Sequence, residues 1–217
     1  MQALSEYKVQ NINDIVFGSE EAKQRINEII EGRKLFPQFG KNGLILYGIW
    51  GTGKTTLAKL LPTAIEKTLS GEALADEQFI QCKQGMNGVD LMRMIDNQAS
   101  LISANYSGKH YFILDEIDNL TVAAQASLKA AMNLSSSIFI MTTNHVELID
   151  KGVKNRSILI EMNAASTEAW LPRVKHYLGV KSSDHRLDIE LIRMIESSQG
   201  SVREIMDGVA TINARLK

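Results

Sequence analysis

The sequence is poor in cysteine, since Cys82 is the only one among 217 residues. A lone cysteine excludes an internal disulfide and a Cys-rich zinc site, and it is typical of a reducing compartment. No apolar run approaches the roughly 20 residues that a membrane-spanning helix needs, and the N-terminus lacks a signal-peptide pattern. We therefore expect a soluble protein of the cytoplasm or another intracellular compartment, with no membrane partner.

An excess of charge of either sign is also missing, because the formal net charge is −1. The protein as a whole has no excess of positive charge that would attract nucleic acid, so any contact with DNA must come from a local basic patch on its surface. The hydrophobic fraction of 44% is ordinary for a protein with a proper core. A chain of this length forms one large domain or two modest ones.

The most informative feature of the sequence is a glycine-rich stretch. The apolar run 44–47 predicts a strand, and the turn that follows opens an apolar helix with the spacing G-x-x-x-x-G-K-[ST] of a phosphate-binding loop. Glycines bring backbone N–H groups close to phosphate oxygens, Lys54 can reach the β- and γ-phosphates, and the Thr55 hydroxyl can ligate Mg²⁺. A glycine-rich turn that precedes a helix by chance is the alternative. The expected phosphate-binding residues are Gly48, Gly51, Thr52, Gly53, Lys54, Thr55 and Thr56.

A second motif follows the continuous apolar run 111–114, which is typical of a strand buried on both faces. This run ends in Asp115 and Glu116. Beside a phosphate loop, Asp115 can hold Mg²⁺ through water, and Glu116 can polarise the water that attacks the γ-phosphate. The alternative is a pair of solvated acids in a loop. Another predicted strand, 138–141, is followed by Asn144, whose amide can orient the attacking water.

Strands alternate with helices up to about residue 163, which indicates an α/β fold with a parallel sheet. The segment 149–157 is predicted as a loop with solvated charges, and Pro62 is expected to sit in or bend the helix after the phosphate loop. From residue 164 onward, three amphipathic helices are predicted over 167–178, 188–197 and 201–216. We therefore expect a nucleotide-binding core over 1–163 and a small all-α domain over 164–217.

The order of these motifs resembles that of the AAA+ ATPases, and most closely the clamp-loader clade typified by replication factor C small subunits. The likeness spans most of the chain. Besides the phosphate loop, it is carried by 15–18, 88–90, 115–118, 125–132, Asn144, 155–157 and 200–203. The resemblance implies ATP and Mg²⁺ as cofactors, a P-loop AAA+ core and a helical lid.

The same resemblance implies roles for four further residues. Val16 belongs to the segment that covers the adenine, and Asn144 is the sensor-1 residue. Arg156 matches an arginine that reaches the γ-phosphate of a neighbouring subunit, which implies a homo- or hetero-oligomer. Arg203 matches the sensor-2 arginine, through which the lid touches the nucleotide.

The sequence departs from the clade at several positions. The usual prolines of the phosphate loop are replaced by Ile49 and Trp50, Cys82 and Asn133 replace an Asn and a Glu, and the N-terminal Tyr-Arg-Pro is reduced to 7–9. We expect Trp50 to project from the outer side of the loop, onto the lid, an adjoining subunit or its own core. No third helical domain follows the lid, as expected of a minimal viral or mobile-element member or of a truncated chain.

The resemblance favours an ATP-hydrolysing loading factor of DNA replication that acts on DNA with a client protein such as a clamp or a helicase. The alternative is a non-enzymatic ATP switch that polymerises on DNA and recruits another factor. Glu116 favours hydrolysis, whereas the missing collar domain favours the switch. The clade's channel-lining helices correspond to candidate DNA contacts at Lys83, Asn87, Arg93 and Lys129.

Overall fold

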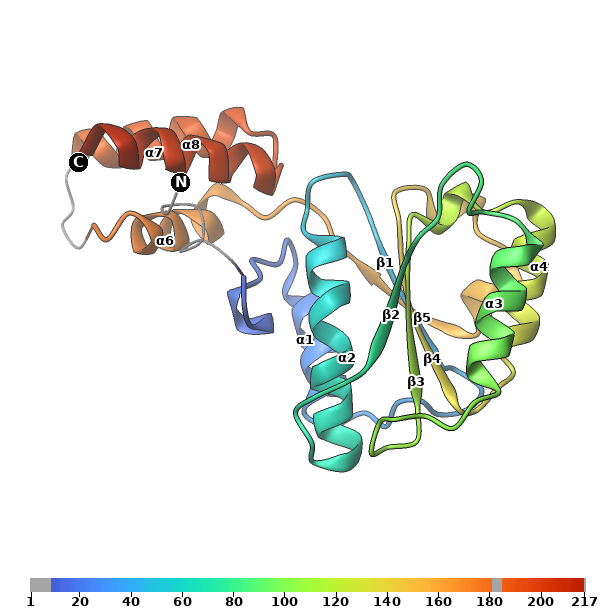
Figure 1. Ribbon diagram of the computed structural model, residues 1–217. Helices are drawn as coiled ribbons and strands as arrows, with labels where there is room; N and C mark the ends of the chain where they lie inside the picture. Colours follow the sequence, from blue (N-terminus) through green and yellow to red (C-terminus); the bar gives the residue numbers. More distant parts are fainter. Residues whose placement is uncertain (1–8, 181–184, 217) are drawn as a thin grey trace.

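A computed structural model describes residues 9–180 and 185–216 of the chain, which leaves Tyr7 and Lys8 outside the described residues. Its centre is a five-stranded parallel sheet with the strand order β2-β3-β4-β1-β5. Helices cover both faces of this sheet, and a group of three helices stands to one side (Figure 1). The strands are β1 (Gly43–Tyr47), β2 (Glu77–Gln81), β3 (His110–Asp115), β4 (Ser137–Thr143) and β5 (Ser157–Glu161). The predicted parallel α/β sheet is confirmed.

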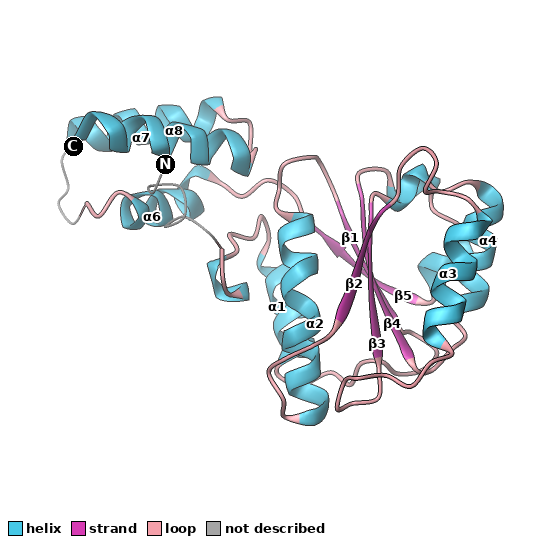
Figure 2. Ribbon diagram, in the orientation of Figure 1, coloured by secondary structure: helices cyan, strands magenta, loops and turns pink. Residues whose placement is uncertain are grey.

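Helices alternate with the strands along the core and follow one another without strands after β5 (Figure 2). The core helices are α1 (Glu20–Ile30), α2 (Lys54–Ser70), α3 (Val89–Ala99), α4 (Val122–Ala131) and α5 (Lys151–Asn155). The lid helices are α6 (Thr167–Tyr177), α7 (His185–Ser197) and α8 (Val202–Leu216). The expected division after residue 163 falls in the segment between β5 and α6.

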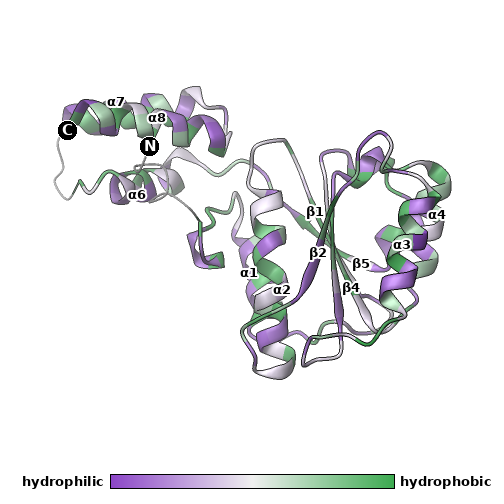
Figure 3. Ribbon diagram, in the orientation of Figure 1, coloured by the Kyte–Doolittle hydropathy of each residue, from purple (hydrophilic) through white to green (hydrophobic). Residues whose placement is uncertain are grey.

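Successive residues of the strands face opposite sides of the sheet, which produces two separate apolar layers. Leu44 and Leu46 of β1 pack with α1 and α2, whereas Ile45 belongs to the layer under α3 and α4. The two helix layers lie on opposite sides of the sheet (Figure 3). The strands β1, β3 and β4 are largely buried, whereas the edge strand β2 is mostly hydrophilic. Because both faces are covered, polar chemistry is confined to the two edges where the strands begin and end.

The three lid helices form a hydrophobic core of their own. Trp170, Val174, Leu191, Ile205 and Val209 are among its buried members. Each of these lies on the apolar face of an amphipathic helix, as the sequence predicts.

Two local expectations need correction or refinement. The segment 149–157 is not only a loop, because the short helix α5 lies within it. Its N-cap Asp150 accepts hydrogen bonds from the backbone N–H groups of Gly152 and Val153. Pro62 lies buried inside α2, which runs from Lys54 to Ser70 as one helix. Of the helices in the described ranges, none has both the length and the apolar character needed to cross a membrane.

Candidate nucleotide site

The phosphate loop joins the end of β1 to the start of α2 at the carboxyl edge of the sheet. Gly51 and Gly53 have φ angles of 79° and 88°, in the left-handed region that favours glycine. Gly53 is the N-cap of α2 and supplies no side-chain hydrogen bond. The N–H groups of the first helical turn therefore face outward without a side-chain cap, which suits an anion such as a phosphate.

Lys54 lies on this turn and is only 7% exposed. Its Nζ donates hydrogen bonds to the backbone carbonyls of Gly48 at 2.9 Å and Ile49 at 2.5 Å. Burial lowers the pKa of Lys54 to about 8, against the opposing effect of the carboxylates of Asp115 and Asp118. A triphosphate placed on the loop supplies the negative charge that favours the protonated amine.

The two residues expected to hold the metal lie directly together. The hydroxyl of Thr55 donates to Oδ1 of Asp115 at 2.8 Å, and Asp115 is 6% exposed. Hydroxyl and carboxylate oxygens are hard ligands of the kind that Mg²⁺ takes together with waters and phosphate oxygens. The donor set therefore fits Mg²⁺ bound to a nucleotide.

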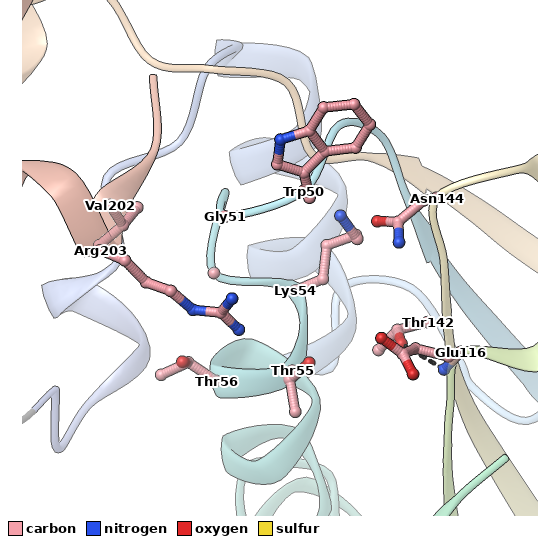
Figure 4. A pocket seen from close by; sticks show the side chains of 11 residues that line it. Trp50, Gly51, Lys54, Thr55, Thr56, Glu116, Thr142, Asn144, Val202 and Arg203 are labelled. Carbon is pink, nitrogen blue, oxygen red and sulfur yellow. Dashed lines mark hydrogen bonds between the residues drawn. The ribbon is translucent and has the colours of Figure 1, made fainter. Parts of the chain in front are cut away.

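Glu116 follows Asp115 in an unusual backbone conformation, with φ 60° and ψ 53°. Residues other than glycine rarely adopt this region, and such strain is concentrated at functional sites. The backbone N–H of Glu116 donates to the hydroxyl of Thr142 at 3.0 Å. This contact fixes the turn that directs the Glu116 carboxylate into the pocket beside Lys54 and Thr55 (Figure 4).

One pocket collects most of the expected site residues from three strand ends and the lid. Asn144 enters it from the end of β4, and Arg203 enters it from the first turn of α8 (Figure 4). Thr52 is buried beneath the loop, where its hydroxyl donates to the carbonyl of Ile49. The full lining is Trp50, Gly51, Gly53, Lys54, Thr55, Thr56, Glu116, Thr142, Asn144, Val202 and Arg203. This arrangement can hold a triphosphate and activate water at its far end.

Comparison with known proteins identifies the family of this chain. The model of AAA, the ATPase family associated with various cellular activities, matches residues 44–163. The chain belongs to the AAA family. It is therefore an ATPase, and its nucleotide-binding core is an AAA domain.

The curated relatives include replication factor C small subunits and Lon proteases. The chain is 27% identical over 209 residues to replication factor C small subunit 2 of Pyrobaculum islandicum, covering 94% of this chain and 61% of the relative. It is 29% identical over 206 residues to replication factor C small subunit of Thermoplasma volcanium, covering 93% and 60%. The chain thus spans about three fifths of the length of these relatives.

Solved structures share the fold at low identity. A Thermotoga maritima RuvB, described as a Holliday junction branch migration motor, matches with a TM-score of 0.60 and 14% identity, covering 95% of this chain and 73% of that one. A Thermotoga maritima protein related to the DNA polymerase III gamma subunit matches with a TM-score of 0.55 and 14% identity, covering 88% and 58%. Both likenesses support the AAA fold.

Val16 lies in a smaller, apolar hollow that borders the phosphate loop of the AAA domain. Thr52, Gly53 and Thr56 form one wall of this hollow, and Trp170 of the lid lies on another. An apolar space directly beside the phosphate loop suits a nucleotide base. The expected adenine-side role of Val16 remains a prediction, and its position in this hollow agrees with it.

Arg156 does not lie in the phosphate pocket. It directly precedes β5, and the backbone N–H groups of Asn42 and Gly43 at the start of β1 donate to its carbonyl. Because β1 and β5 are parallel, Arg156 lies at the amino edge of the sheet and the phosphate loop at the carboxyl edge. At about 3.3 Å per residue, the length of β1 alone separates these edges by about 13 Å. Its guanidinium donates instead to the Asn133 side chain and the Gly152 carbonyl.

Sequence reasoning missed two contributors to the site. Thr142 is 2% exposed, accepts the Glu116 N–H and donates to Oδ1 of Asp115 at 2.6 Å. The backbone N–H of Val202 donates to the carbonyl of Gly51 at 2.8 Å, which ties the lid directly to the phosphate loop. A threonine at the end of a strand beside the acid pair is a signal that could have found Thr142. No local pattern predicts the Val202 contact.

Proposed function

We propose that this AAA ATPase is a clamp-loader-like loading factor of DNA replication that hydrolyses ATP as an oligomer on DNA. The names of the replication factor C relatives support the role in replication. Since the chain covers about three fifths of those relatives, the activity and partners of the complete relatives stay part of this proposal.

The proposed reaction divides the work among the residues of the pocket. The phosphate loop and Lys54 bind the triphosphate, while Thr55 and Asp115 would hold Mg²⁺. When bound, Mg²⁺ neutralises charge on the phosphate oxygens. The Glu116 carboxylate accepts a proton from the attacking water, and the Asn144 amide orients that water. Arg203 contacts the nucleotide from the lid.

The position of Arg156 is the observation that supports the proposed oligomer. An arginine at the amino edge cannot serve the pocket at the carboxyl edge of its own sheet. It is well placed to serve another copy whose carboxyl edge faces it, in the manner of an arginine finger supplied in trans. Contacts of this head-to-tail kind close into rings or continue as filaments, depending on the rotation between copies.

Counting subunits tests this proposal. Mass photometry and negative-stain microscopy, with a non-hydrolysable ATP analogue and DNA present, separate a closed small ring or spiral from an open filament. A small closed assembly supports a loading factor. An open filament would favour the alternative, an ATP switch that polymerises on DNA and recruits another factor. A monomer under all conditions would overturn both.

DNA contact is proposed at the beginning of α3 and the loop before it. Lys83 and Arg93 are exposed, although Arg93 forms an ion pair with Asp90. Lys129 is half-buried, and its side chain packs against Gly152, so it is a weaker candidate. Asn87 is partly occupied by a hydrogen bond from its side chain to the carbonyl of Asn119.

Charge reversal tests this site. We expect Lys83→Glu with Arg93→Glu to weaken ATP-dependent DNA binding and reduce its salt dependence, while basal ATPase activity is retained. The matched control is Lys67→Glu with Arg193→Glu, two exposed cations elsewhere. Equal losses in both double variants would show that only net charge matters.

A client protein has a candidate docking surface at the amino edge, on the loops before β2 and β3. Leu74, Leu101, Ile102 and Tyr106, here called the client patch, are 79%, 63%, 99% and 80% exposed. Clusters of exposed apolar residues are typical of protein interaction sites. The two loops are joined by Asn105, whose side chain bonds both backbone groups of Asp76. We expect Ile102→Ser to lower client-stimulated ATPase activity and to leave basal activity unchanged.

A further inference from the structure

A second hollow at the amino edge of the sheet is not used by the nucleotide site. It is lined by Pro37, Phe39, Lys41, Lys109, Met132 and Leu134, among others, and is here called the Phe39 pocket. Its volume is about 360 Å³. The Phe39 side chain is 90% exposed at a backbone φ of 53°, and Leu134 is 40% exposed. An exposed aromatic held at a strained backbone position is an unfavourable arrangement unless something covers it.

Arg156 lies at the rim of the Phe39 pocket. Its Nε donates to Oδ1 of Asn133 at 3.1 Å, and its carbonyl accepts the N–H of Asn42 at 3.2 Å. Asn133 and Asn42 both line the pocket. A molecule that contacts the Arg156 side chain on its Asn133 side therefore lies next to this pocket.

The two edges differ in charge once a nucleotide is bound. Lys41 and Lys109 line the Phe39 pocket, and their ammonium groups donate to backbone carbonyls. At the carboxyl edge, the phosphate pocket is lined by Glu116 and by the cations Lys54 and Arg203, and Asp118 lies close enough to act on the charge of Lys54. A bound triphosphate adds further negative charge there. The amino edge of one copy is thus electrostatically complementary to the nucleotide-bound carboxyl edge of another.

Trp50 is a large, exposed apolar side chain at the carboxyl edge. It lies on the rim of the phosphate pocket, 73% exposed, with the neighbouring Ile49 45% exposed (Figure 4). The reach of an arginine side chain is limited, so Arg156 can approach the phosphates of another copy only if the rim of that copy's phosphate pocket comes close to the surroundings of Arg156.

We propose that Trp50 of one copy inserts into the Phe39 pocket of a second copy, and that this contact sets the register in which Arg156 reaches the ATP. The proposal rests on the proposed oligomeric function and names the surface that joins the copies. A large aromatic side chain seated in a partner's pocket is the usual anchor of an interface. The contact is head-to-tail, so every interior copy uses both surfaces.

Fluorescence tests this contact. The chain has two tryptophans, and Trp170→Phe leaves Trp50 as the only reporter. With a non-hydrolysable ATP analogue at a protein concentration that supports assembly, we expect the Trp50 emission to shift to shorter wavelength and to resist quenching by acrylamide. Phe39→Ser with Leu134→Ser should abolish both changes and weaken association at least about 30-fold. The control, Ile102→Ser with Tyr106→Ser in the client patch, should preserve them.

Cross-linking supplies a second readout that does not depend on Trp170. Cys82 is fully buried, so cysteines introduced at the surface react without interference from it. Mixing Ile49→Cys protein with Leu134→Cys protein should give an ATP-dependent disulfide dimer, whereas Ile49→Cys with Tyr106→Cys should not.

The outcomes separate this inference from the proposed function. If copies assemble with ATP while Trp50 stays exposed and no dimer is trapped, the contact is wrong and the oligomer stands. If the protein remains monomeric with ATP and DNA at every concentration, the proposed function fails as well. A Trp50 shift that survives Phe39→Ser with Leu134→Ser would come from the nucleotide alone and would also overturn the contact.

Discussion

The two edges of the sheet are built differently. At the carboxyl edge, buried polar groups are bonded to one another: Asp115 accepts from Thr55 and Thr142, and Lys54 donates to the loop's own carbonyls. At the amino edge, apolar side chains such as Phe39 and Ile102 lie in solvent. The first arrangement is a preorganised site for a small ligand, and the second is a surface that needs a macromolecular partner. The following predictions test this difference, from the largest expected effect to the smallest.

Turnover should depend most strongly on Glu116. Glu116→Gln keeps the shape of the side chain and removes the group that accepts a proton, so we expect ATPase activity to fall about 100- to 10,000-fold. ATP affinity should change little. The matched control is Glu147→Gln, an exposed acid that contacts His145. Parental activity in Glu116→Gln would remove Glu116 from the mechanism.

Nucleotide binding should depend most strongly on Lys54. Removal of a buried charged partner of the phosphates costs about 2–5 kcal/mol, so we expect Lys54→Ala to lower ATP affinity at least about 30-fold. Lys59→Ala, on the exposed side of the same helix, should bind normally. Thermal melting of both variants verifies that they fold. Equal affinities would contradict the assignment of the phosphate loop.

The lid should contribute less than the loop. Arg203→Ala removes a charged hydrogen-bond donor from the pocket while the Val202 backbone contact to Gly51 remains. Since a hydrogen bond to a charged group contributes about 1.5–3 kcal/mol, we expect ATP affinity to fall about tenfold. Arg203→Lys should recover part of the loss. Unchanged affinity in Arg203→Ala would place the arginine outside the bound nucleotide.

The pH dependence of binding follows from the pKa of Lys54, which is about 8 in the free protein. Bound phosphate favours the protonated amine and raises this pKa, so binding takes up a proton above pH 8. Affinity is then full below pH 8, and the apparent dissociation constant should rise about tenfold between pH 7 and pH 9. Calorimetry at pH 8.5 in two buffers with different ionisation enthalpies measures the proton uptake. Binding without proton uptake would contradict the prediction.

The sequence predicts the carboxyl edge well because its chemistry lies in short contiguous motifs. Lys54, Thr55, Asp115 and Glu116 are each adjacent to the strand or helix that positions them. Asn144 follows a predicted strand and Arg203 was placed by family resemblance, and both line the pocket. The helix α5 was missed because a five-residue helix is too short to show an amphipathic period.

The amino edge could not be predicted in the same way. The Phe39 pocket requires three segments, 37–42, 109 and 132–135, to converge, and no local pattern encodes that meeting. The exposure of single side chains could not be predicted either. The sequence alone does not distinguish Phe39, which lies at the surface, from Phe36, which is buried. Only the assembled fold shows that Arg156 and its own phosphate pocket lie at opposite edges.

A mixing experiment tests most directly whether the site of one copy is completed by another. Arg156→Ala retains an intact phosphate pocket but lacks the arginine, whereas Lys54→Ala retains the arginine but binds ATP only weakly. Each protein alone should show little ATPase activity, and their mixture should exceed the sum of the two. If no mixture ratio gives activity above that sum, an arginine supplied in trans is contradicted.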